Sequence, residues 1–174
     1  MGNRASSDSP GSFSEKRRKR VLVVGAGATG CEILKNLALL GVSRLIVADD
    51  DSVEISNLSR QFLYRRRDVG RNKALTAAAA VAALNRDVAV TGLPHRVDGP
   101  SLETVFDDAF WSDVDLIFTA LDSVEARLFV DGVAVARRLP LVDCGTLGAS
   151  GSVQPVRQAA PRPTPPRAGA AARR

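Results

Sequence analysis

The chain has 174 residues, enough for one domain with a sizeable core, and its 45% hydrophobic and 25% charged content is ordinary for a globular protein. No apolar run reaches the roughly 20 residues of a membrane span, and the polar start does not resemble a signal peptide, so we expect a cytoplasmic or nuclear protein with no membrane partner. The two cysteines, Cys31 and Cys144, exclude a disulfide framework and a zinc site of paired cysteines.

The net charge of +5 comes from the two ends of the chain. Residues 1–20 hold six lysines and arginines against two acids, and residues 157–174 hold five arginines and no acid, which leaves residues 21–156 net negative. Because a nucleic-acid binder normally carries its basic patch on the folded domain, we expect no nucleic-acid partner. The basic run at residues 16–20 fits either a nuclear-targeting patch or a solvated lead-in to the first strand.

Composition divides the chain into three segments. We expect residues 1–20 to be a disordered basic arm and residues 157–174 to be a disordered tail, since the Pro, Ala and Arg of the tail offer no large apolar side chain to bury. Residues 21–156 are then the folded domain.

Within this domain, short apolar runs alternate with helical patterns. The patterns predict strands at residues 21–24, 45–48, 88–91, 116–120 and 140–143, and helices at residues 29–40, 71–84 and 124–138. Gly41 ends the first helix. This alternation predicts an α/β fold, a Rossmann-like parallel sheet with helices on both faces, in which ligands bind beyond the carboxyl ends of the strands.

A G-x-G-x-x-G motif directly follows the first predicted strand and opens the first helix. It consists of Gly25, Ala26, Gly27, Ala28, Thr29 and Gly30. Glycines let the turn close and let a phosphate approach the backbone, and the helix N-terminus attracts an anion, although a tight turn can also use glycine for packing alone. Asp49, at the end of the second strand, can accept hydrogen bonds from ribose hydroxyls. These features fit an NAD-dependent oxidoreductase and an ATP-dependent enzyme equally.

Three charged residues favour ATP. Arg60 and Lys73 can supply cations for a triphosphate, and Asp122, a lone carboxylate after the fourth strand, can hold Mg²⁺ together with phosphates and water. Each residue has a simpler explanation: Arg60 as a surface arginine, Lys73 as a helix-surface lysine, and Asp122 as a helix N-cap. Since all three fall at predicted strand tips, we take them as the catalytic residues of an ATP·Mg²⁺ site, with Asp122 as the metal ligand.

Several sequence blocks resemble the active adenylation half of eukaryotic ubiquitin-activating enzymes (E1), members of the E1/ThiF/MoeB superfamily. The blocks are residues 25–36, Asp49-x-Asp51, and residues 56–63, 120–122, 125–127 and 145–148. The last of these, with residues 106–111, is more similar to ubiquitin-type E1 than to bacterial ThiF or MoeB. The resemblance covers residues 21–156 and identifies them as part of a ThiF/E1-type ATP-binding adenylation domain.

The resemblance implies a reaction and a set of site residues. The C-terminal glycine carboxylate of ubiquitin or a ubiquitin-like protein attacks the α-phosphate of ATP, pyrophosphate leaves, and an acyl-adenylate forms. The implied contacts are Asp49 to the ribose; Asn57, Arg60, Gln61 and Lys73 to the nucleotide and phosphates; Asp122 to Mg²⁺, with Asp51 near it; and the backbone around Val97 to the adenine. The implied partners are ubiquitin or a relative and a second adenylation domain, in a homodimer or heterodimer.

The chain departs from the family pattern at three positions. Ser59 and Ser123 stand where the family usually has Asn, and Cys144 stands where it has Ser, before a glycine turn. We expect Cys144 to be structural rather than a nucleophile. Cys31 lies in the first turn of a helix, whose dipole can lower a thiol pKa, but the family does not use this cysteine for thioester chemistry. We expect the only histidine, His95, to be a solvated loop residue.

A full-length E1 would continue after about Val156 with the thioester cysteine domain, and would carry a second, inactive adenylation half that supplies an arginine. We therefore expect an incomplete fragment. Three functions remain: an adenylating half-site, a folded nucleotide-binding or partner-binding fragment without chemistry, and an NAD-dependent oxidoreductase. The last leaves Arg60, Lys73 and Asp122 unexplained.

Overall fold

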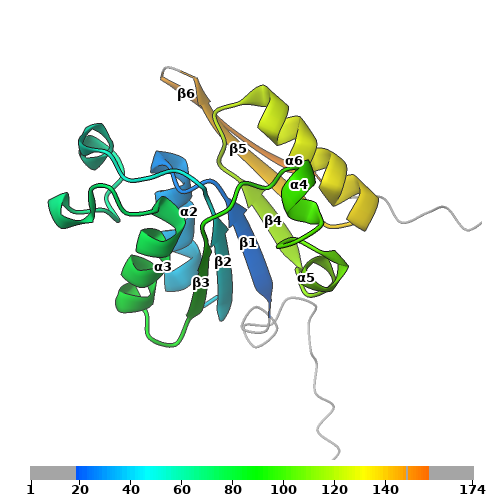
Figure 1. Cartoon of the computed structure of the whole chain (residues 1–174), viewed down its shortest axis with the longest axis horizontal. Helices are drawn as coiled ribbons and strands as arrows, with labels where there is room; N and C mark the ends of the chain where they lie inside the picture. The colour runs from blue at the N-terminus through cyan, green and yellow to red at the C-terminus, as the bar shows by residue number, and fades with distance from the viewer. Residues whose placement is uncertain (1–18, 148, 157–174) are drawn as a thin grey trace, which may run out of the picture.

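A six-stranded sheet runs through the centre of the computed structural model, which describes residues 19–147 and 149–156 (Figure 1). Its strands are β1 (Arg20–Val24), β2 (Arg44–Ala48), β3 (Ala89–Leu93), β4 (Leu116–Thr119), β5 (Leu141–Leu147) and β6 (Ser150–Val156). They lie in the order β3-β2-β1-β4-β5-β6, and the first five are parallel. The strand order reverses between β1 and β4, which is where a doubly wound sheet opens a crevice for a ligand.

Helices cover both faces of the sheet, as the sequence predicted. One face packs against α2 (Ala28–Leu39) and α3 (Lys73–Leu84), and the other against α4 (Gly99–Leu102), α5 (Asp108–Ser112) and α6 (Val124–Arg137). Alternate side chains of β1 serve the two layers: Val21 and Val23 pack on the first face, whereas Leu22 and Val24 pack on the second. A strand buried on both sides needs the continuous apolar run that residues 21–24 supply.

Two short 3₁₀ helices, η1 (Ile55–Ser59) and η2 (Arg66–Asp68), lie in the long connection from β2 to α3. η1 holds the predicted site residue Asn57, and the predicted site residues Arg60 and Gln61 follow it directly, although the sequence predicted no regular structure there. The predicted helix and strand boundaries otherwise lie close to the observed ones. The predicted tail at residues 157–174 and nearly all of the predicted basic arm lie outside the described residues, and β1 begins at Arg20, the last residue of that arm.

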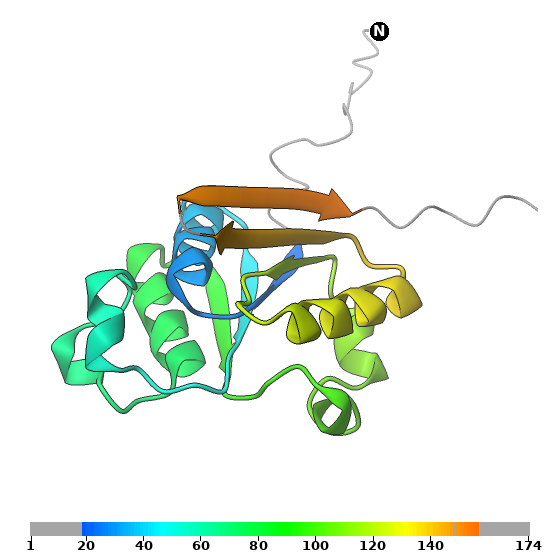
Figure 2. The ribbon, with the colours of Figure 1, turned by 90° about the horizontal axis from the view of Figure 1, so that it is seen from above.

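The edge strand β6 corrects the prediction of a wholly parallel sheet. It pairs antiparallel with β5, with Leu141 opposite Val156 at one end and Leu147 opposite Ser150 at the other (Figure 2). Nearly all of its side chains are exposed, so the sequence has no apolar run there to mark a strand. Because β5 continues to Leu147, Gly145 lies within a strand rather than in the predicted turn.

An aromatic cluster fills the space between the sheet and the α5 segment. Phe110 meets Phe106 and Trp111 edge to face, with ring centroids 5.0 and 5.2 Å apart, and Trp111 is only 2% exposed. Such pairs contribute beyond the area they bury. Among the described helices, none combines the length and apolar character needed to cross a bilayer.

The cluster yields a stability prediction. Trp111→Ala should lower the free energy of unfolding by about 3–5 kcal/mol, because it removes a buried aromatic ring and leaves a cavity. Leu128→Ala, at a side chain that is 66% exposed on α6, is the control and should change it by less than about 0.5 kcal/mol. Urea denaturation followed by circular dichroism measures both. Equal effects of the two substitutions would show that the cluster is not part of the stabilising core.

Candidate functional site

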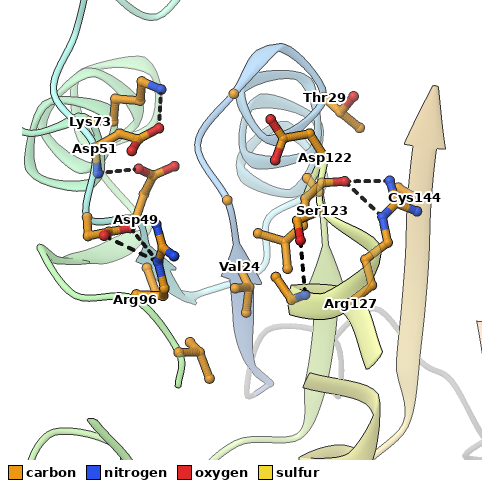
Figure 3. A pocket seen from close by; sticks show the side chains of 18 of the residues that line it. Val24, Thr29, Asp49, Asp51, Lys73, Arg96, Asp122, Ser123, Arg127 and Cys144 are labelled. Atoms are coloured by element: carbon orange, nitrogen blue, oxygen red, sulfur yellow. Dashed lines mark hydrogen bonds and ion pairs between the residues drawn. The ribbon is translucent and has the colours of Figure 1, made fainter. Parts of the chain in front are cut away.

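A cavity of about 660 Å³ opens at the carboxyl ends of β1, β2 and β4, at the point where the strand order reverses (Figure 3). The structure brings most of the predicted site residues to its wall. These are Gly25, Gly27, Ala28, Thr29, Asp49, Asp51, Asn57, Arg60, Gln61, Lys73, Val97 and Asp122. The other two, Ala26 and Gly30, are buried members of the glycine loop (residues 25–30).

The three glycines of this loop differ in how much space a side chain would have at each position. Gly25 has φ +97°, and a Cβ there would lie 2.5 Å from the Ala120 carbonyl oxygen; a Cβ on Gly30 would lie 2.0 Å from the Gly25 carbonyl oxygen. These two glycines are therefore required for close packing of the backbone. A Cβ on Gly27 would meet no atom of the described residues within 4 Å. Packing alone does not account for Gly27, which leaves an open approach to the N-terminus of α2, where backbone N–H groups attract anions.

Three side chains hold the glycine loop in place. Asp49 Oδ2 accepts a hydrogen bond from the Ala26 amide (2.7 Å), and its Oδ1 accepts one from the Asp51 amide (2.9 Å). The buried Tyr64 hydroxyl donates to the Ala26 carbonyl (2.7 Å), which the Cys31 thiol also approaches (Sγ–O 3.7 Å). Sequence reasoning did not predict this role of Tyr64, because its partner lies 38 positions away.

Burial raises the pKa of Asp49 above its ordinary value, although the two amide donors and the charge of Lys73 oppose the rise. Half of the carboxylate's hydrogen-bonding capacity is already directed at backbone amides. Asp49 therefore serves first to hold the loop in place, and it lines the cavity together with Asp51.

Lys73 is not the helix-surface lysine that was one explanation of the sequence. Its side chain is 11% exposed, and its Nζ lies 2.8 Å from Asp51 Oδ2 (Figure 3). Asn72 caps α3 by accepting a hydrogen bond from the Leu75 amide (3.0 Å), and its side-chain nitrogen donates to the carbonyls of Asp49 (2.9 Å) and Asp51 (3.1 Å). The start of α3 is thereby tied to the end of β2, which holds the Lys73 ammonium at the cavity.

The buried side-chain amide of Gln61 lies just after η1. Gln61 is 4% exposed and lines the cavity, and its Oε1 has no hydrogen-bond partner among the described residues. A buried acceptor without a partner is costly, so this atom points to a donor that the described residues do not supply. Asn57, also buried, uses its Oδ1 to accept from the Glu54 amide (3.0 Å). The exposed Arg60 donates to the Ser56 carbonyl (3.0 Å).

Asp122 is not the N-cap of α6, which was the simpler explanation of its position. Ser123 holds that role, and its Oγ accepts from the Ala126 amide (3.3 Å). The exposed Asp122 carboxylate makes no hydrogen bond or ion pair with any part of the chain that the structure describes, so it is available to a cation. The structure does not bring Asp51 to it: Figure 3 shows the two on opposite sides of the glycine loop, and Asp51 instead clusters with Asp49 and Asp50.

Two further arginines line the cavity without having been predicted as site residues. Arg96 forms an exposed ion pair with Asp50 (Nε–Oδ2 3.3 Å), next to the buried Val97. Arg127 makes an ion pair with Asp143 (Nη1–Oδ2 2.9 Å) and donates to the Leu121 carbonyl (Nε–O 2.9 Å). The sequence included Arg127 in a family-like block but offered no reason for its role.

The structure also shows the surroundings of Cys31, Cys144 and His95. Burial raises the pKa of the Cys31 thiol to about 11, so burial outweighs any lowering by the helix dipole. Tyr64 and the segment around Leu63 enclose the sulfur. Burial also raises the pKa of the Cys144 thiol, with the charge of Asp143 adding to the effect, as fits a structural cysteine. His95 is exposed in the loop after β3, as predicted.

Comparison with known proteins agrees with this geometry. The family model described as "ThiF family" matches residues 10–168. The chain is 51% identical over 142 residues to "Ubiquitin-activating enzyme E1 2" of Arabidopsis thaliana, which covers 79% of the chain and 13% of the relative. It is 46% identical over 144 residues to "Ubiquitin-like modifier-activating enzyme 1" of Homo sapiens, which covers 80% of the chain and 14% of the relative.

A third relative, "Ubiquitin-activating enzyme E1 1" of Candida albicans (strain WO-1), is 44% identical over 152 residues, 83% of the chain and 15% of the relative. The chain thus spans about a seventh of the length of these curated relatives. The match to the family model takes in the whole sheet, the glycine loop and the cavity. The chain belongs to the ThiF family.

Proposed function

We propose that this chain forms an ATP·Mg²⁺ half-site for adenylation of the C-terminal glycine of ubiquitin or a ubiquitin-like protein. The observation that carries the proposal is the open face of the glycine loop at Gly27, flanked by the Lys73 ammonium on one side and the Asp122 carboxylate on the other. The relatives named above as ubiquitin-activating enzymes support the same activity.

The polar groups of the cavity match the parts of ATP. Phosphate oxygens only accept hydrogen bonds, and they suit the N-terminus of α2 together with Arg60 and Lys73. The Gln61 Oε1 requires a donor, and among the parts of ATP only the ribose hydroxyls and the adenine amine are donors. Asp122, a free carboxylate, would hold Mg²⁺, whose charge would offset that of the phosphates.

The proposed adenylation reaction requires little proton transfer. A carboxylate oxygen of the terminal glycine attacks the α-phosphorus, the bond from that phosphorus to the pyrophosphate oxygen breaks, and acyl-adenylate and pyrophosphate result. The carboxylate is ionised at neutral pH, so no base is needed. The chain's residues contribute by holding the reacting groups in line and by neutralising charge on the leaving pyrophosphate, a role that Arg60 and Lys73 can fill.

A second candidate is a folded fragment that binds nucleotide without performing chemistry. The observation that favours it is the small share of the relatives that the chain spans, because the whole enzymes' activity can depend on parts beyond that share. An NAD-dependent oxidoreductase is less well supported, since it leaves the free carboxylate of Asp122 without a function.

Ligand titration tests the proposal. We expect saturable binding of Mg-ATP by isothermal titration calorimetry, weakened at least about tenfold by Lys73→Ala, which removes a charge-assisted contact, and by Asp122→Asn, which removes the metal ligand. Asp87→Asn, in the exposed turn between α3 and β3, is the matched control and should leave binding unchanged. Binding of NAD in preference to ATP would contradict the proposal.

A catalytic assay separates the two candidates. Exchange of labelled pyrophosphate into ATP that depends on added ubiquitin would establish adenylation by the chain itself. If Mg-ATP binds but no exchange occurs with ubiquitin or any ubiquitin-like protein tried, the chain is the binding fragment rather than the half-site of an active enzyme.

The glycine loop gives a further prediction. Gly27→Ala should leave the thermal midpoint within a few degrees of wild type, because its Cβ meets no atom of the described residues. It should weaken Mg-ATP binding by about tenfold or more, because the Cβ would stand where a phosphate approaches the backbone. Gly132→Ala, another glycine with open space around it but in the middle of α6, should leave affinity unchanged. Equal affinity for Gly27→Ala and wild type would show that no ligand uses this approach.

A further inference from the structure

One arginine joins three separate elements next to the cavity. From α6, Arg127 donates to the Leu121 carbonyl through Nε (2.9 Å) and also through Nη2, and it pairs with Asp143 of β5 through Nη1 (2.9 Å). The other carboxylate oxygen of Asp143 accepts a hydrogen bond from the Thr119 hydroxyl at the end of β4. We call this set, Thr119, Asp143, Arg127 and the Leu121 carbonyl, the Arg127 clamp.

The fold leaves the guanidinium little freedom to move. Thr119 and Asp143 are directly paired in the β4–β5 ladder, so the anchoring carboxylate is fixed by both strands. The Arg127 side chain is only 24% exposed. A Cβ on Gly145 would lie 2.6 Å from both Nη1 and Nη2, so the absence of a side chain there makes the room in which the guanidinium lies.

The clamp acts on the peptide that carries Asp122. Leu121, whose carbonyl receives both donors, immediately precedes it in the chain. The Asp122 carboxylate itself has no hydrogen bond to the described residues, so its direction depends on the backbone that the clamp fixes. A planar guanidinium can give two parallel donors to one carbonyl and a third to a carboxylate, which a lysine ammonium of the same charge cannot reproduce.

We propose that Arg127 is a positioning residue, which orients the Asp122 carboxylate toward a divalent cation bound with the nucleotide phosphates. The inference rests on the proposed function for the role of Asp122. A positioning role predicts a result that a purely structural role does not. Loss of the Arg127 clamp should weaken metal-dependent nucleotide binding more than metal-free binding.

The test uses the full chain with Arg127→Lys, and with Arg137→Lys near the other end of α6 as the matched control. Binding of ATP is titrated with excess Mg²⁺ and again with EDTA. We expect Arg127→Lys to weaken binding by about tenfold with Mg²⁺, as loss of a residue that supports a metal ligand typically does, and by less than about twofold in EDTA. Gly145→Ala, which displaces the same guanidinium, should reproduce this pattern. Equal loss in both conditions, or no loss, would overturn the inference.

Amide hydrogen exchange supplies a readout that needs no ligand. In the unliganded chain, Arg127→Lys should accelerate exchange at residues 121–123 by about tenfold relative to Arg137→Lys, with exchange in β1 unchanged. Unchanged exchange at residues 121–123 would overturn the inference whatever the binding results. Accelerated exchange in a chain whose wild type binds no Mg-ATP would support the clamp and contradict the proposed function instead.

Discussion

The close approach of the glycine loop to the end of β4 is the constraint on which the rest of the site depends. The Gly25 backbone lies so near the Ala120 carbonyl that no side chain fits between them, and a Cβ on Gly30 would lie even closer to the Gly25 carbonyl. These two contacts set where α2 begins and which way its N-terminus points. They also place the loop directly beside the peptide that carries Asp122. A larger residue at either glycine would shift both the anion-binding backbone and the free carboxylate.

The charges around this loop divide into two groups that are held by different elements. On the β2–α3 side, the carboxylates of Asp49, Asp50 and Asp51 are paired with Lys73, Arg96 or backbone amides. On the β4–α6 side, Arg127 is paired with Asp143, and Asp122 has no partner in the part of the chain that the structure describes. A triphosphate would therefore compete with Asp51 for the Lys73 ammonium, whereas a cation would find Asp122 already free. Binding would therefore cost energy mainly on the β2–α3 side, where the ion pair of Asp51 and Lys73 would have to break.

The sequence predicted the parts of the molecule whose signals are local. Continuous apolar runs identified β1 and β2, alanine content identified α3, and the glycine spacing identified the loop. β6 was missed because its place depends on pairing with β5, and α4 and α5 were missed because they are too short for a helical period to show. In the site, Tyr64 and Arg127 act through contacts between residues that are distant in the chain, and the raised pKa of Cys31 comes from burial that overrides the helix dipole.

The position of the cavity has a consequence for stability. The cations that suit phosphates stand on the β2–α3 side, the carboxylate that suits a metal stands on the β4–α6 side, and the glycine loop lies between them. A ligand that engaged all three would bridge the two halves of the sheet at the point where they meet, β1 and β4. Because such a ligand binds only the folded chain, it would stabilise the fold by an amount that rises with its concentration above its dissociation constant. The unsatisfied Gln61 oxygen adds to this coupling, since the ligand that supplies its donor also removes a buried polar cost from the fold.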